Sequence, residues 1–318
     1  MYNSVHGKFI ATPLYNILLD GIYASASIKA GAETYPMGEY FFQSLFLRMT
    51  GAQEQKMKCV CWELATNDYT YRYDLLHNKN YGECSNYYEK CNIYKDLIEL
   101  IRKMQPDFTV YQLWEDITIE QETLEKERKK WEKKIEEYNK KQAHAIIKKK
   151  EKETGTSLNQ DEKDKIINGL KSRSLPEEDF RQHIASVKKN TIISDLMHSI
   201  KNMLASSQIV LWKQADFDAF SSCWPNNLKP EWIATSNSRL LESKLQKFYE
   251  EVVYYHRNRC AHNTNSYQLD LPSLKTIADK GYGNQNYFYR FALLILIDEV
   301  FVRLYRKYQS LLGYDIII

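Results

Sequence analysis

Residues 291–302 read FALLILIDEVFV and form the most apolar run of the chain. The run contains Asp298 and Glu299 and is shorter than the roughly 20 predominantly apolar residues that a membrane-spanning helix needs. It therefore predicts a buried helix in a globular core, not a membrane span. We expect it to lie within a final helix from Asn286 to Leu312.

The composition of the whole chain also favours helices. Its 318 residues include only 11 Gly and 7 Pro, so residues that interrupt helices are scarce. Hydrophobic residues make up 43% and charged residues 27%, an ordinary globular balance. The 24 Tyr fit the same interpretation, because a tyrosine can fill a core and still use its hydroxyl group. We predict an all-α fold of one large or two ordinary domains.

Apolar residues recur at helical spacing through most of the remaining chain. The further predicted helices cover residues 40–49, 53–77, 86–104, 118–153, 174 to about 212 and 238–255. Helix-boundary signals stand at Thr12-Pro13 (a start), Gly155 (an end), Asn159-x-x-Glu162 and Ser174-x-x-Glu177 (two capping boxes). No strand pattern with hairpin signals accompanies them.

The middle of the chain differs from both ends. From residue 118 to 153 Lys, Glu and Gln dominate, and apolar residues recur at sevens at Leu124, Trp131, Tyr138 and Ala145. This thin stripe predicts a long charged helix that projects or packs in an antiparallel hairpin. The predicted parts are 1–112, an N-terminal part of a bundle; 113–173, a charged hairpin insertion; and 174–318, the C-terminal part.

The charge of the chain does not by itself identify a ligand. The net charge is +3, too small to indicate nucleic acid. Between Glu125 and Lys171 basic residues exceed acidic ones by five, an excess that suits either a solvated helical surface or contact with RNA.

The six cysteines indicate reduced thiols. Cys59 and Cys61 are too close together for the usual zinc knuckle, and no His cluster accompanies them, so we expect neither a metal site nor a cofactor. Residues 1–31 lack a basic flank followed by a continuous apolar run, so we expect no signal peptide. These features predict a cytoplasmic protein without membrane contact.

The stretch most informative about function is residues 254–263, which read YYHRNRCAHN. It follows an apolar helix directly. On a helix Asn258 and His262 are four residues apart and share one face, and the long side chain of Arg257 can reach the same place. An imidazole, an amide and a guanidinium are thus expected within reach of one small anion.

These three groups suit the cleavage of RNA without a metal. In that reaction the 2′-hydroxyl attacks the neighbouring phosphate, which requires a proton shuttle and stabilisation of charge on the phosphoryl oxygens. Histidine titrates in the right range for the shuttle, and arginine offers a fixed cationic fork for the oxygens. No carboxylate cluster of the metal-nuclease kind stands out in the sequence, which favours the metal-free route.

The stretch resembles the Arg-x4–6-His signature of the HEPN superfamily, in which Asn, Asp or His often follows the Arg. The run RNRCAHN, residues 257–263, is especially similar to HEPN proteins of abortive-infection and toxin systems. The resemblance is sharp over about ten residues and architectural elsewhere. It implies a helical bundle, a homodimer in which two Arg/His pairs meet in one cleft, and metal-independent endoribonuclease activity in a toxin or anti-phage role.

Carried over residue by residue, the resemblance makes Arg257 and His262 catalytic and Asn258 their polar helper. It makes His256, Arg259 and Asn263 RNA-binding neighbours. One departure is Thr264, which stands where some HEPN toxins carry a tyrosine that an antitoxin modifies. An antitoxin or sensor protein is an expected partner, although that departure argues against one of the tyrosine-modifying kind.

Three alternatives remain open. The same basic motif would serve a non-catalytic helical module that binds a nucleotide or RNA or senses a partner. After the nuclease and the binding module, a scaffold protein in which Arg257 caps a helix end is the third class of function. In addition, Arg72 and His77 repeat the Arg-x4-His spacing, which suits either an ordinary amphipathic helix or a second HEPN-like half.

Overall fold

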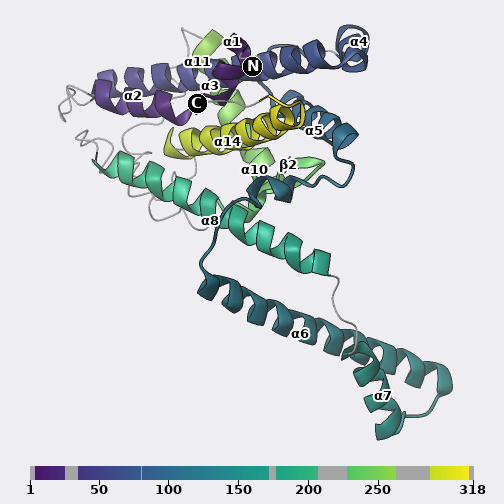
Figure 1. Ribbon diagram of the computed structural model, residues 1–318. Helices are drawn as coiled ribbons and strands as arrows, with labels where there is room; N and C mark the ends of the chain where they lie inside the picture. The colour runs from purple at the N-terminus through teal and green to yellow at the C-terminus, as the bar shows by residue number, and fades with distance from the viewer. Residues whose placement is uncertain are drawn as a thin grey trace. The chain divides into compact units, whose positions relative to one another are not determined.

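The computed structural model describes residues 4–25, 35–79, 81–171, 177–206, 228–262 and 287–314 (Figure 1). The described chain is almost entirely helical, which confirms the predicted all-α fold. No helix among these residues is long and apolar enough to cross a membrane. The chain separates into two compact units, Met1–Leu113 with Asn190–Ile318 as unit 1 and Trp114–Lys189 as unit 2.

Helix α14 (Tyr287–Leu311) forms the core of unit 1 and confirms the predicted buried helix. Every residue from Tyr289 to Asp298 is buried, and α14 packs against three helices of the N-terminal region. Those helices are α1 (Val5–Ala11), α3 (Tyr35–Asn67) and α5 (Tyr87–Met104). The long apolar run is thus explained by contacts on all sides of the helix.

Helix α2 (Tyr15–Ser25) packs on α3 through a close approach at Gly21, where a Cβ atom would lie 2.8 Å from the Leu45 side chain. The expected helix start at Thr12-Pro13 needs correction. Thr12 instead ends α1, and its hydroxyl donates to the Lys8 carbonyl.

A buried ion pair organises the turn between α1 and α2. Asp298 of α14 accepts a hydrogen bond from the Leu14 amide at 2.7 Å, and its other oxygen pairs with Lys56 of α3 at 2.7 Å. Lys56 also donates to the Thr12 carbonyl. The cap of the second helix is therefore supplied by a carboxylate distant in sequence.

The N-terminal helices differ in their bounds from the sequence prediction. Helix α3 runs without a break through residues 40–49 and 53–67, because Gly51 is tolerated within it. Asp68 then interrupts the predicted helix 53–77 by capping the separate helix α4 (Tyr69–His77). Asn86 caps α5, as its predicted start at residue 86 requires.

The prediction that the chain lacks a hairpin is wrong in one place. Strands β1 (Ile233–Ser236) and β2 (Arg239–Leu241) form a small antiparallel pair after the 3-10 helix η4 (Pro230–Trp232). Asn237 in the turn accepts from the Val110 amide at 2.7 Å and donates to the Phe108 carbonyl at 3.0 Å. These contacts are remote in sequence, which explains why local pattern does not reveal the hairpin.

Tyrosines hold this hairpin against the rest of unit 1, in keeping with the tyrosine-rich composition. The Tyr94 hydroxyl donates to the Ser236 carbonyl at 2.8 Å, and the Tyr111 hydroxyl donates to the Thr235 carbonyl at 2.6 Å. Each side chain fills space and satisfies a backbone group at once.

Unit 2 contains α6 (Gln121–Thr154), α7 (Gln160–Lys171) and the first part of α8 (Glu177–Ser206). Gly155 ends α6 with a left-handed φ of 68°, and Asn159 and Glu162 form the predicted capping box with bonds of 2.8 and 3.1 Å. The signal at Ser174 and the segment from 207 to 212 lie outside the described residues. That this unit is an insertion into a HEPN-like bundle stays a prediction.

The predicted apolar stripe of α6 is wrong in its second half. Tyr138 and Ala145 are exposed, whereas Ala143 and Ile147 are buried. The less exposed positions follow a spacing of four residues, which winds slowly around a straight helix. Helix α6 packs against α7.

Candidate functional site

The motif lies at the end of one continuous helical segment. Glu242 caps its start by accepting from the Lys244 amide at 2.7 Å. The segment comprises α10 (Ser243–Phe248), the π-helix η5 (Tyr249–Tyr254) and α11 (Tyr255–His262). The predicted helix 238–255 therefore begins later, because β2 takes up residues 239–241.

The wider π turn comes directly before the motif. π-helical turns are rare and change which side chains face a neighbouring element. Here Leu245, Tyr249, Val253 and His256 are buried along the segment. Helix α11 packs against α3, and Phe46 of α3 lies 5.2 Å from the His256 ring, centroid to centroid.

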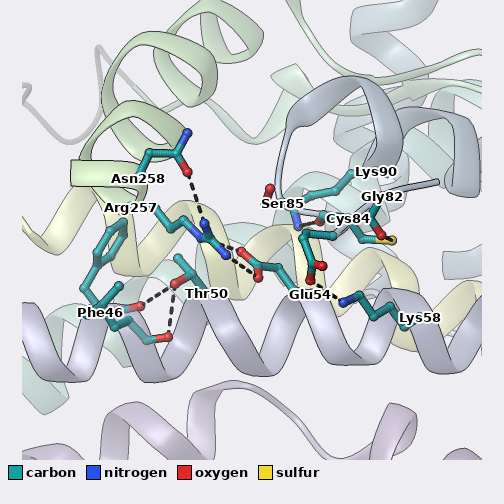
Figure 2. A network of polar contacts seen from close by, with 12 residues as sticks. Phe46, Thr50, Glu54, Lys58, Gly82, Cys84, Ser85, Lys90, Arg257 and Asn258 are labelled. Carbon is teal, nitrogen blue, oxygen red and sulfur yellow. Dashed lines mark hydrogen bonds and ion pairs between the residues drawn. The ribbon is translucent and has the colours of Figure 1, made fainter. Parts of the chain in front are cut away.

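Arg257 forms a two-point ion pair with Glu54 of α3 (Figure 2). Its Nε donates to Glu54 Oε1 and its Nη2 to Oε2, both at 2.9 Å. The Arg257 side chain is 17% exposed and the Glu54 side chain 10% exposed, so the pair is mostly removed from water. Nη1 donates to Asn258 Oδ1 at 3.1 Å. The structure thus brings Arg257 and Asn258 together, with a carboxylate that sequence reasoning missed.

A buried lysine lies in the same region (Figure 2). Lys90 of α5 donates from Nζ to the Cys84 carbonyl at 2.5 Å, where Cys84 takes a left-handed φ of 58°. Burial lowers the Lys90 pKa to about 8, and the charge of Glu54 opposes that shift. Burial likewise raises the Tyr249 pKa, with the Glu54 charge as a further cause. Glu54 therefore influences groups on three elements.

His256 is buried, at 8% exposure, and lies in the interior of this segment. Its Nε2 is 3.4 Å from Cys260 Sγ, one helical turn away. This placement gives His256 packing contacts with Phe46 and Cys260. Its predicted role in RNA binding stays a prediction.

The other predicted site residues are described only in part. His262 is the last residue of α11, and its side chain lies outside the described part of the chain, as does that of Arg259. Asn263 lies wholly outside the described residues.

The second Arg-x4-His pair has well-defined local contacts on α4. Arg72 donates to the Ala65 carbonyl at 2.6 Å and to the Thr66 carbonyl at 3.2 Å, so it caps the end of α3. The His77 ring stacks on Tyr73 with centroids 4.2 Å apart. These contacts support the ordinary helical interpretation of this pair.

No group of three His, Cys, Asp or Glu side chains within the described ranges is arranged to hold a metal ion. A comparison of the chain with models of known families finds no match, and searches of curated proteins and solved structures find no significant match. The motif and the contacts of Arg257 are therefore the features that point to a function.

Proposed function

We propose that the chain is a metal-independent endoribonuclease of the HEPN type, acting as a toxin or anti-phage effector in the cytoplasm. The observation that carries the proposal is the cluster of Arg257, Asn258 and Glu54. In this cluster a guanidinium of α11, the helix that bears His262, contacts an amide of the same helix and a carboxylate of α3. The resemblance of residues 257–263 to HEPN proteins supports the same assignment.

In the proposed reaction the RNA 2′-hydroxyl attacks the adjacent phosphorus and the 5′-oxygen leaves. The products are a 2′,3′-cyclic phosphate and a 5′-hydroxyl. His262 carries out one of the two proton transfers at these oxygens, and Arg257 stabilises the charge on the non-bridging oxygens. Asn258 orients the guanidinium through its Oδ1 contact. Unpaired RNA is the expected substrate, because a duplex resists the in-line geometry.

A homodimer is part of the proposal. One Arg/His pair supplies too few groups for both proton transfers, and a second copy would bring another Arg257 and His262 to the cleft. An antitoxin or sensor protein would restrain or trigger the activity, and no membrane partner is proposed.

A non-catalytic binding module is the second candidate, and one observation favours it. Glu54 already neutralises Arg257 in a mostly buried pair. A pair of this kind can have a purely structural role, here the attachment of α11 to α3. The third class, a scaffold in which Arg257 caps a helix end, stays an alternative beside the side-chain contacts of Arg257 with Glu54 and Asn258.

The test is cleavage of a labelled mixed-sequence RNA in EDTA by the wild type, His262→Ala and the matched control His77→Ala. We expect the wild type and His77→Ala to cut equally, and His262→Ala to lose at least about a hundredfold in rate. Equal cutting by all three would refute His262 as the catalytic residue. No cutting by any form, as monomer or dimer, would favour the binding module.

A further inference from the structure

Six lysines of α6 differ in their partners. Lys126, Lys140 and Lys149 each pair with a glutamate four residues away, at 2.6, 3.1 and 4.0 Å respectively. Lys141, Lys148 and Lys152 are exposed, and no carboxylate of the described residues lies within 4.0 Å of their ammonium groups. The second group therefore presents positive charge that the helix itself does not neutralise.

Lys141, Lys148 and Lys152 share one side of the helix. Together with Lys134 and Tyr138 they form what we call the lysine row: Lys134, Tyr138, Lys141, Lys148 and Lys152. Their separations of four, three, seven and four residues return to one side of a helix with 3.6 residues per turn. Ala143 and Ile147 are 2% and 8% exposed and lie on the opposite side in this half of the helix.

The local sequence strengthens the asymmetry. No acidic residue occurs from Tyr138 to Lys150. Glu151, the next one, is occupied by Lys163 at 2.9 Å and by the Leu158 amide at 3.2 Å. At about 1.5 Å rise per residue, Lys134 to Lys152 spans roughly 27 Å, enough for several phosphates of one strand.

The side chains of the row favour RNA over a lipid surface. Tyr138 is 60% exposed among the lysines, and an exposed ring between cations can stack on an unpaired base. Helices that lie in a membrane interface instead present large apolar residues opposite their basic face. In this half of α6 Ala143 and Ile147, which lie opposite the row, are buried and cannot enter a membrane.

We propose that the lysine row is an RNA-binding surface that captures single-stranded substrate through its phosphates. This inference deepens the proposed endoribonuclease function and rests on it for the identity of the ligand. The row belongs to unit 2, so it is built from residues other than those of the Arg257 cluster.

The test measures binding separately from cleavage. The probe is a fluorescent mixed-sequence 2′-O-methyl RNA, which lacks the attacking hydroxyl, and the readout is its anisotropy with the full chain over a series of salt concentrations. The test variant is Lys141→Gln/Lys148→Gln/Lys152→Gln. The control is Lys126→Gln/Lys140→Gln/Lys149→Gln, which removes the same charge from the same helix.

We expect the test variant to bind about tenfold more weakly near 0.1 M salt and its salt slope to fall by about two, whereas the control changes by less than about twofold. Tyr138→Ala should weaken binding with an unchanged salt slope. Equal losses in both triple variants, or none in either, would overturn the proposal. So would a row-dependent binding of phosphatidylserine vesicles with unchanged RNA affinity.

The two proposals fail separately. If the wild type cuts no RNA in EDTA but the row variant still loses RNA affinity relative to the control, the RNA-binding surface stands and the nuclease does not. If the wild type cuts RNA and both triple variants bind equally, the nuclease stands and the row is a solvated face.

Discussion

Glu54 holds Arg257 by two parallel hydrogen bonds of 2.9 Å across a separation of 203 residues. This fork geometry is the one by which arginine also binds phosphate, so a phosphate ligand competes for the donors that Glu54 engages. A substitution of Glu54 therefore tests the role of Arg257 without changing Arg257 itself.

Glu54→Gln should increase the affinity of Arg257 for oxyanions, because the substitution removes the competing charge. It should also lower the free energy of unfolding by about 2–4 kcal/mol, since Arg257 is left mostly buried without its counter-charge. The measurements are urea denaturation and the rise of Tm with inorganic phosphate. Glu122→Gln is the control, because Glu122 pairs with Lys126 at the surface of α6. An equal response of both variants to phosphate would contradict the prediction.

Lys56→Met should destabilise unit 1 strongly. Lys56 and Asp298 are each 3% exposed, and the substitution leaves the Asp298 carboxylate buried with the Leu14 amide as its remaining partner among the described residues. Loss of one member of a buried pair costs about 3–5 kcal/mol. Urea denaturation of Lys56→Met and of Lys103→Met, whose pair with Asp68 is far more exposed, measures the difference. A smaller loss in Lys56→Met than in the control would refute this role.

Lys90 should give the wild type a distinctive pH dependence of stability. Burial lowers its folded-state pKa from 10.5 to about 8, so the unfolded chain binds more protons between these values. The free energy of unfolding contributed by Lys90 therefore rises with pH through that window. Relative to Lys90→Met, in which this dependence is absent, the wild type should gain about 1–2 kcal/mol from pH 7.5 to 9.5.

The comparison with Lys90→Met removes the opposing contributions of groups that Lys90 does not influence. Burial raises the pKa of Cys61 to about 12, which lowers stability as pH rises above 9 in both proteins. Stability curves for the wild type and Lys90→Met that stay parallel would show that Lys90 does not titrate in this range.

The fold was predictable where local pattern decides structure. The apolar run of α14 is one continuous segment, and the capping box at Asn159 and the end of α6 at Gly155 each depend on residues close in sequence. The β hairpin was not predictable, because Asn237 and the tyrosines that hold it make contacts remote in sequence.

The candidate site was predictable only on one side. The motif identified Arg257 and Asn258 from their spacing. Glu54, the ion-pair partner of Arg257, has no distinctive sequence pattern around it. Glu54 precedes Lys58 by four residues, which suggests an exposed pair along α3. Lys58 instead forms an ion pair with Glu83, and Glu54 forms one with Arg257. The pairing of Glu54 with Arg257 depends on the packing of α11 against α3, which residue spacing alone does not specify.

The double variant Glu54→Leu/Arg257→Met should separate the structural role of the pair from catalysis. Apolar replacement of a buried ion pair is often neutral or stabilising, whereas either single substitution leaves an unpaired buried group. We therefore expect the double variant to be more stable than Arg257→Met or Glu54→Leu alone, by about 1–3 kcal/mol of coupling in urea denaturation. If Arg257 stabilises the phosphoryl charge, the double variant folds and cuts no RNA. Wild-type cleavage by a stable double variant would leave Arg257 as a fastening between α11 and α3.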